Sequence, residues 1–218
     1  MTIDVKICGL KTEEAVAAAL EAGADMIGFV FFPKSPRNVS IETAARLAVP
    51  ARGRATIVAL AVDPDDALVT AIASGLRPDL VQLHGHETPE RCAAIRAASG
   101  IPVMKAIPVA EAADLAIVPA YLPHVDRLLF DAKPPKHPDA LPGGNGLAFD
   151  WRLVRDLDPG RPFMLSGGLT PDTVATAIEM TGVAGVDVSS GVESAPGVKD
   201  PEKIRAFVAR ARAARPRS

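Results

Sequence analysis

The sequence predicts an α/β fold in which eight strands and eight helices alternate and close into a single (β/α)8 TIM barrel. Short β-branched runs alternate eight times with alanine-rich helical stretches. The strand runs are almost entirely apolar, as expected for parallel strands that are covered on both faces. Dividing the 218 residues by eight leaves about 27 residues per unit, which is enough for such a barrel. An open doubly wound sheet is the alternative, but no G-x-G-x-x-G pattern follows the first strand.

The individual elements follow from these periodicities in chain order. The strands are expected at Val5–Cys8, Met26–Phe31, Thr56–Val62, Leu80–His84, Val103–Ala106, Arg127–Asp131, Phe163–Ser166 and Gly185–Ser189. The helices are expected at residues 12–23, 41–49, 64–74, 88–99, 111–117, 149–156, 171–180 and 201–213. Helix-start signals are Thr12, Ser40, Asp63 before Pro64, Thr88 before Pro89 and Thr170 before Pro171. No linker divides the chain, so residues 1–218 are predicted to form one domain.

Composition and charge exclude several classes of partner. The net charge of −2 gives no reason to expect a nucleic-acid partner. The longest apolar run, around Ile57 to Val62, is far too short to cross a bilayer, and no signal peptide is recognisable. Two cysteines make no disulfide framework. We therefore expect a cytoplasmic protein without a membrane partner.

Two side chains at strand ends are candidates for chemistry, because the carboxyl ends of barrel strands form the active face. Cys8 ends the first strand and is followed by Gly9. It is either a small buried hydrophobic residue or a base whose pKa is lowered by positive potential. Asp131 follows three large apolar residues at the end of the sixth strand. Either it orders a loop, or its partly desolvated carboxyl group donates a proton. Cys92, inside a helix, is assigned to packing.

Candidate ligand-binding groups follow other strands. Ser166-Gly167-Gly168-Leu169 and Asp187-Val188-Ser189-Ser190-Gly191 follow the seventh and eighth strands, where glycines expose backbone N–H groups that bind phosphate. Arg37, in the loop after the second strand, presents a planar fork suited to a carboxylate, although a surface salt bridge is the alternative. His84 either lines the pocket or is a structural histidine.

The longest irregular segment, Ala132–Ala148, follows the sixth strand and carries Gly143-Gly144-Asn145-Gly146. A loop of this length in a compact domain is often functional, so we interpret it as a lid over the active face. His84 and His86 lack matching metal-ligating partners, and there is no nucleotide fingerprint, so neither a metal nor a cofactor is expected. An acid and a base without a cofactor indicate proton transfers on a phosphosugar, as in an isomerase or epimerase.

An ordered set of motifs resembles the phosphoribosylanthranilate isomerase family. The motifs are Lys6-Ile7-Cys8-Gly9-Leu10, Gly28-Phe29-Val30-Phe31, Ser35-Pro36-Arg37, Val81-Gln82-Leu83-His84-Gly85, Gly143-Gly144-Asn145-Gly146 with Phe149-Asp150-Trp151, Ser166-Gly167-Gly168-Leu169 and Asp187-Val188-Ser189-Ser190-Gly191-Val192-Glu193. They run in order from residue 5 to about residue 200. One departure is Asn145, where the family more often has threonine or serine.

The resemblance implies an Amadori rearrangement in tryptophan biosynthesis that needs no cofactor. N-(5-phosphoribosyl)anthranilate would become 1-(2-carboxyphenylamino)-1-deoxyribulose 5-phosphate. By the family mechanism Asp131 would protonate the ring oxygen, and Cys8 as thiolate would then remove the C2 proton. Arg37 would hold the anthranilate carboxylate, and backbone groups of Gly167, Gly168, Ser190 and Gly191 would hold the phosphate. The substrate-binding set is completed by His84, Gly144, Gly146, Ser166, Asp187 and Ser189.

Two other functions remain open at this stage. A related phosphosugar barrel, such as an epimerase or the histidine-pathway isomerase, is one alternative. The histidine-pathway enzyme uses two aspartates, so a cysteine at position 8 speaks against it. A catalytically silent barrel that binds a phosphorylated ligand is the other. Family members are monomers or homodimers, and the sequence does not choose between these states.

Overall fold

Eight parallel strands close into a barrel in the computed structural model, which describes residues 2–135 and 141–215. The strands pair with their neighbours in chain order, and β8 pairs with β1 to close the circle. Their bounds are β1 (Asp4–Cys8), β2 (Met26–Phe31), β3 (Thr56–Ala61), β4 (Leu80–Leu83), β5 (Val103–Val109), β6 (Arg127–Ala132), β7 (Phe163–Leu165) and β8 (Gly185–Val188). The predicted fold class is confirmed, and most predicted strand ends lie within one residue of the observed ones.

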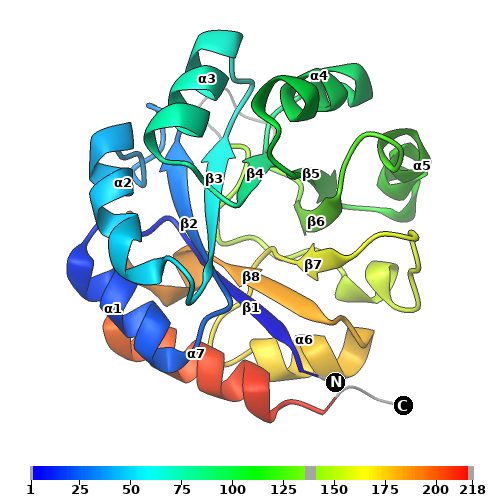
Figure 1. The fold of residues 1–218 in the computed structure, drawn as a ribbon. Coiled ribbons are helices and arrows are strands. Elements are labelled where there is room, and N and C mark those ends of the chain that lie inside the picture. The colour runs from blue at the N-terminus through cyan, green and yellow to red at the C-terminus, as the bar shows by residue number, and fades with distance from the viewer. Residues whose placement is uncertain (1, 136–140, 216–218) are drawn as a thin grey trace.

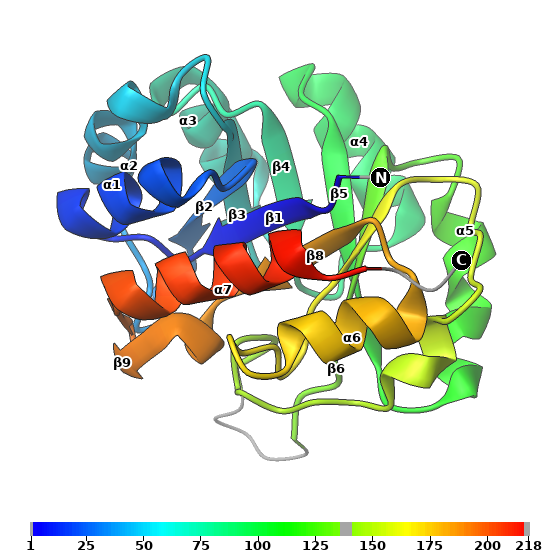
Figure 2. The same ribbon diagram turned by 90° about the horizontal axis from the view of Figure 1, so that it is seen from below.

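Helices surround the strands on the outside of the barrel (Figure 1). The α-helices are α1 (Glu13–Ala22), α2 (Ile41–Ala48), α3 (Asp66–Gly75), α4 (Pro89–Ser99), α5 (Val118–Tyr121), α6 (Val174–Thr181) and α7 (Pro201–Ala213). The 3-10 helices are η1 (Val49–Ala51), η2 (Ala112–Ile117), η3 (Trp151–Val154) and η4 (Ser190–Val192). The last helix, α7, packs between α1 and α6 (Figure 2). This packing joins the two ends of the chain's helical ring.

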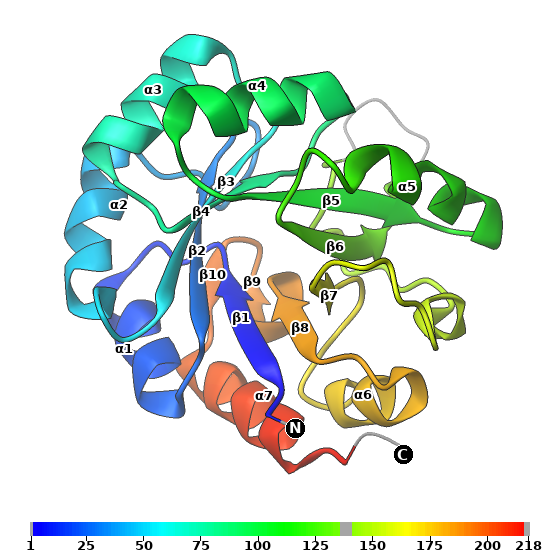
Figure 3. The same ribbon diagram turned by 45° about the vertical axis from the view of Figure 1, so that its right-hand side comes forward.

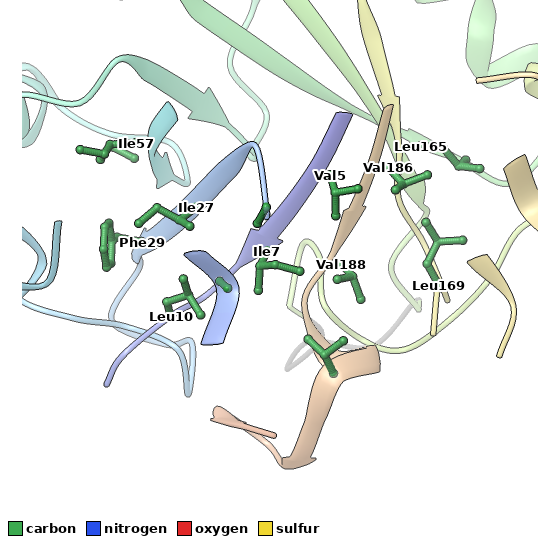
Figure 4. Packing of buried hydrophobic residues seen from close by; sticks show 14 of the residues in the cluster. Val5, Ile7, Leu10, Ile27, Phe29, Ile57, Leu165, Leu169, Val186 and Val188 are labelled. Carbon is green, nitrogen blue, oxygen red and sulfur yellow. The ribbon is translucent and has the colours of Figure 1, made fainter. Parts of the chain in front are cut away.

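The outer faces of the strands form the main hydrophobic core with the helices. Val5 and Ile7 of β1, Ile27 of β2 and Val186 and Val188 of β8 are all buried there (Figure 4). Because side chains alternate along a strand, the residues between them face the barrel interior. The floor of the interior is a second apolar cluster, formed by Met26, Val58, Leu80, Met104, Ala106, Leu129 and Met164.

Polar side chains lie above this apolar floor, toward the carboxyl ends of the strands. The same alternation places Lys6 and Cys8 of β1, Gln82 of β4, Asp131 of β6 and Asp187 of β8 inside the barrel. All five are buried. Buried polar groups require partners to offset their lost hydration, so this layer must form an ordered network. The alternation of side chains along the strands therefore gathers these polar groups inside the barrel, near the carboxyl ends of the strands.

Some of the helix starts predicted from the sequence agree with those in the structure. Thr12, Ser40 and Thr88 are confirmed as N-caps, because each side chain accepts a backbone N–H in the first turn. The prediction for Asp63 is wrong: Asp65 caps α3. The Asp63 backbone is left-handed rather than extended, as an N-cap residue requires, so α3 begins only after Asp65.

Asp63 instead orders a neighbouring loop. Its backbone has a positive φ of 46°, and its carboxylate accepts the backbone N–H of His86 at 2.6 Å. The start predicted at Thr170 is also displaced, because α6 begins at Val174. The intervening residues form a turn in which the Thr170 N–H donates to the Thr173 hydroxyl at 2.9 Å.

Two predicted α-helices are shorter or tighter than expected. Residues 149–156 contain only η3, because Asp156 has a positive φ of 58°, which an α-helix cannot contain. Residues 111–117 form η2 and continue into the short α5. In η2 the Asp114 carboxylate accepts the N–H groups of Ala110 and Glu111, which fixes the tight start.

A two-stranded hairpin that was not predicted follows β8. Its strands are β9 (Glu193–Ala195) and β10 (Val198–Lys199), and they pair antiparallel (Figure 3). Gly197, with a φ of 78°, supplies the left-handed turn between them. Of the residues that the structure describes, none belongs to a helix long and apolar enough to cross a membrane.

Candidate active site

One cavity at the carboxyl ends of the strands collects nearly all of the predicted site residues. The two candidate catalytic groups enter it from different sides, Cys8 from β1 and Asp131 from β6. The loops after the strands and the predicted lid supply the rest of its wall. The predicted residues that line it are Cys8, Arg37, His84, Asp131, Gly144, Gly146, Ser166, Gly167, Gly168, Asp187 and Ser189. The topology therefore brings together side chains that lie far apart in the sequence.

Ser190 and Gly191 are the two predicted residues that do not line this cavity. Both belong to η4, directly after β8. A side chain at position 191 would collide with the backbone carbonyl of Leu169, in the loop after β7. Gly191 therefore allows the loops after β7 and β8 to touch, which explains its residue type without a ligand.

Cys8 belongs to a buried polar network. A Cβ atom on Gly28 would lie 3.0 Å from Cys8 Sγ and 3.4 Å from Lys6 Cε, so the thiol and the lysine converge over this glycine. The Lys6 ammonium donates to Asp187 Oδ1 at 2.7 Å, and the Ser166 hydroxyl donates to Asp187 Oδ2 at 3.2 Å. Lys6 is fully buried. The thiol therefore lies beside a buried ion pair.

Burial and the positive charges near the thiol shift the pKa of Cys8 in opposite directions. Burial raises the pKa of Cys8 above its ordinary value of 9.0, although the Lys6 ammonium, and more weakly that of Lys199, lower it. Positive potential therefore does not bring the pKa of Cys8 toward neutrality, because desolvation is the larger effect. Burial alone would lower the pKa of Lys6, but Asp187 and Cys8 raise it above its ordinary value, so Lys6 stays charged.

Asp131 is held by two groups. Its Oδ1 accepts the backbone N–H of Ala132 at 2.9 Å, and its Oδ2 lies 3.2 Å from His84 Nε2. The other ring nitrogen, His84 Nδ1, lies 3.1 Å from Gln82 Nε2. A Cβ atom on Gly143 would come within 2.6 Å of His84 Nε2 and 2.8 Å of Asp131 Oδ2, so the predicted lid lies directly against this pair.

Arg37 is already engaged by a carboxylate of the protein itself. Its Nε and Nη2 donate to the two oxygens of Glu193 at 2.7 and 2.9 Å, and Nη2 also donates to the Gly144 carbonyl at 3.2 Å. The fork expected to grip a substrate carboxylate is thus occupied by Glu193. The remaining atom, Nη1, lies against Gly144 of the lid, where a Cβ atom would be 2.5 Å away.

Lys199 supports the same corner of the cavity from the hairpin. It donates to Glu193 Oε1 at 2.7 Å and to the Ser189 carbonyl at 2.8 Å. Burial lowers its pKa, although Glu193 acts in the opposite direction. For Glu193 burial acts the other way and by itself would raise the pKa. Hydrogen bonds from Arg37 and the charge of Lys199 outweigh burial and hold the pKa of Glu193 below its ordinary value. Glu193 therefore remains a carboxylate that orients both cations.

The glycines after β7 have the backbone that an anion-binding turn requires. Gly167 and Gly168 have φ values of 82° and 68°, in the left-handed region that favours glycine. The Gly167 carbonyl accepts the indole N–H of Trp151 at 3.1 Å, and Ala148 of the lid lies against Gly168. This turn is consequently fixed from the outside while its inner side lines the cavity.

The predicted lid begins with Ala132, the last residue of β6, and is irregular at the other residues that the structure describes, 133–135 and 141–148. Residues 136–140 of this segment lie outside the described residues. Asn145, the departure from the family pattern, donates from its side-chain amide to the Leu141 carbonyl at 2.7 Å. The residue therefore stabilises the loop's own turn.

Several polar residues of the site were given no role from the sequence, although Lys6, Gln82 and Glu193 belong to the family motifs. Lys6, Gln82, Lys199 and Glu193 are buried or nearly so, and each contacts a predicted residue. The available signal for Lys6 and Gln82 was a polar residue inside an apolar strand, two positions before a candidate. In the described ranges 2–135 and 141–215 no group of three or more His, Cys, Asp or Glu side chains is arranged to hold a metal ion.

Comparison with known proteins assigns the chain to a family. The family model described as N-(5'-phosphoribosyl)anthranilate (PRA) isomerase matches residues 5–210. The chain belongs to this isomerase family. Its relatives of that name in Azorhizobium caulinodans and Rhodopseudomonas palustris strain BisB5 are 60% and 59% identical to it over 98% of the chain, covering 93% and 97% of the relatives.

Solved structures of PRA isomerases have the same fold. The Thermotoga maritima PRA isomerase is 37% identical, with a TM-score of 0.85 over 97% of this chain and 99% of the other. A second PRA isomerase structure, in complex with reduced 1-(o-carboxyphenylamino)-1-deoxyribulose 5-phosphate, is 36% identical, with a TM-score of 0.82 and the same coverage. The resemblance drawn from the sequence motifs is thereby confirmed.

Proposed function

We propose that this protein catalyses the Amadori rearrangement of N-(5-phosphoribosyl)anthranilate to 1-(2-carboxyphenylamino)-1-deoxyribulose 5-phosphate in tryptophan biosynthesis. The observation that carries the proposal is the placement of Cys8 and Asp131 in one cavity, in a chain of this family. The reaction is an isomerisation: C2 of the sugar is oxidised, C1 is reduced, and no external oxidant or cofactor is needed. An acid and a base suffice.

In the proposed mechanism Asp131 gives a proton to the furanose ring oxygen. The bond between C1 and that oxygen breaks, and the anthranilate nitrogen forms a Schiff base with C1. Cys8, as thiolate, then takes the proton from C2. The electron pair of the broken C2–H bond forms the C1–C2 double bond of the enolamine. Tautomerisation delivers a proton to C1 and leaves the ketone at C2. Both reacting groups line the cavity, as general acid–base catalysis requires.

The remaining contacts suggest how the two ends of the substrate are held. The inner side of the Gly167–Gly168 turn would bind the phosphate, as the loops after strands seven and eight often do in such barrels. Arg37 would bind the anthranilate carboxylate through Nη1, since Nε and Nη2 are held by Glu193. Glu193 thus fixes the direction in which the arginine points. The lid would close by residues 143–146 over both.

A direct assay tests the proposal. Substrate is generated in situ from anthranilate and phosphoribosyl pyrophosphate, and the loss of its fluorescence is followed after protein is added. We expect protein-dependent conversion to the ketose product. Binding of product analogue by calorimetry without turnover would instead support a silent binding barrel. Equal activity on the histidine-pathway substrate would support an enzyme of the histidine pathway or one that serves both pathways. The thiol at position 8 argues against this alternative.

The protonation of Cys8 gives a separate prediction. Because burial raises the pKa of this thiol, alkylation of Cys8 by iodoacetamide, followed by mass spectrometry, should keep accelerating as the pH rises past 9.0. Lys6→Met should shift the curve to still higher pH, since the ammonium favours the thiolate. Cys92, whose pKa burial raises to about 11, is the internal control. A rate that levels off at neutral pH would contradict the assignment.

We also propose a cytoplasmic monomer or homodimer that acts on this small phosphosugar. A related structure is described as mutually generated monomers of the dimeric Thermotoga maritima enzyme, so that relative is described both as a dimer and as monomers. Light scattering of the purified protein over a range of concentrations distinguishes the two states.

A further inference from the structure

We propose that Gln82 is a positioning residue for this reaction: its carboxamide selects the tautomer of His84, and His84 in turn orients the acid Asp131. The inference rests on the proposed function. It concerns a side chain that lies below the cavity and does not line it. The three side chains come from β4, the loop after it and β6, and together they form one chain of polar contacts, a hydrogen bond between Gln82 and His84 and a 3.2 Å approach of His84 Nε2 to Asp131 Oδ2.

Packing does not explain why residue 82 is polar. It is fully buried inside the barrel, and its register partners on the adjacent strands are Leu60 and Met104, both apolar. Its Oε1 has no hydrogen-bond partner among the described residues. An unpaired buried carbonyl destabilises a fold, and a leucine or methionine would fill this place without that cost. Among the residues that the structure describes, the amide has one polar contact, which is to His84. The effect of the amide is therefore expected to act through His84.

The contact determines where the imidazole carries its proton. In the orientation that the structure gives the Gln82 amide, its nitrogen donates to His84 Nδ1, and the ring proton of a neutral imidazole then lies on Nε2. Nε2–H then donates toward Asp131 Oδ2, 3.2 Å away. Oδ1 is held at the same time by the Ala132 N–H.

This arrangement matters most after Asp131 has released its proton. The carboxylate that forms then accepts the Ala132 backbone N–H and has His84 Nε2 3.2 Å from its other oxygen, and both groups stabilise its negative charge. With the opposite tautomer, a lone pair on Nε2 would face the carboxylate and repel it. Gly143 lies against the same two atoms on the lid side, where a side chain at this position would collide with them. Gln82 therefore acts on the acid only through His84.

Two substitutions separate this role from simple packing. Gln82→Met keeps the side-chain length and removes both polar atoms. Gln82→Glu keeps the shape but presents only acceptors, which places the ring proton on Nδ1. We expect Gln82→Met to lower kcat about 10- to 100-fold, as loss of an outer hydrogen-bond partner does at other sites, with KM changed by no more than about twofold. Gln82→Glu should lower kcat at least as far.

A double-mutant cycle with His84→Ala tests whether the effect passes through the imidazole. Once His84 is absent, Gln82→Met should cause no further loss of kcat, whereas a structural effect would add to the first loss. Nitrogen NMR of the imidazole rings, with the His84 signals assigned by their absence in His84→Ala, should show Nε2–H in the wild type and Nδ1–H in Gln82→Glu.

Three results would overturn the inference: wild-type kcat in Gln82→Met, an additive loss in the His84→Ala background, or an Nδ1–H tautomer in the wild type. Thermal unfolding of each variant checks that it is folded. The wild-type assay is done first, so an inactive wild type refutes the proposed function, while an active wild type with an unchanged Gln82→Met refutes only the role of Gln82.

Discussion

Replacing either catalytic candidate should reduce turnover at least about 10²-fold, the low end for the loss of a general acid or base. Cys8→Ala removes the thiol from the cavity wall and with it the group proposed to take the C2 proton. Asp131→Asn retains the side chain's shape and its acceptor for the Ala132 N–H, but cannot donate the proton that opens the ring. The measurement is kcat in the fluorescence assay.

Cys92→Ala is the matched control for the thiol, because Cys92 is buried in α4 and does not line the cavity. It should turn over substrate at nearly the wild-type rate. Both catalytic variants should still bind reduced 1-(o-carboxyphenylamino)-1-deoxyribulose 5-phosphate in calorimetry, since the groups proposed to hold phosphate and carboxylate remain. A near-normal rate in either variant would remove that residue from the mechanism.

The second large effect is on stability. Lys6→Met should lower the free energy of unfolding by about 3–5 kcal/mol, because it leaves a buried carboxylate without its cation. The side chains of Lys6 and Asp187 are 0% and 6% exposed, and the ion pair is 2.7 Å long. Only the Ser166 hydroxyl would still contact Asp187. Urea denaturation at neutral pH measures the change.

Two further variants make this prediction specific. Adding Asp187→Asn to Lys6→Met should recover most of the lost stability, since the neutral amide needs no cation and retains a contact with Ser166. Arg205→Met, which breaks exposed ion pairs with Glu21 and Glu202, should cost no more than about 1 kcal/mol. If Lys6→Met were as mild as Arg205→Met, the buried pair would not stabilise the barrel as inferred.

The fold and much of the site were predictable because they depend on local patterns. The alternation of apolar runs with helical stretches determined the barrel, and residues at strand ends such as Cys8, Asp131 and Gly167 then had to meet at one face. Thr12, Ser40 and Thr88 were recognisable as caps because capping uses only groups within one helical turn. The helix starts predicted at Asp63 and Thr170 were wrong, because the chain makes a turn at each of them before the helix begins.

Only the tertiary structure decided what each site residue contacts. Arg37 is held by Glu193, and Lys6 pairs with Asp187. Gln82 reaches Asp131 through His84. Each of these arrangements joins strands or loops that are distant in sequence. The same is true of the pKa of Cys8: the sequence showed a lysine two residues away, but not how far burial would outweigh it. The sequence by itself determined the barrel and the family, because periodicity and ordered motifs are local. The balance of desolvation against charge depends on three-dimensional distances, and the folded chain alone determines those.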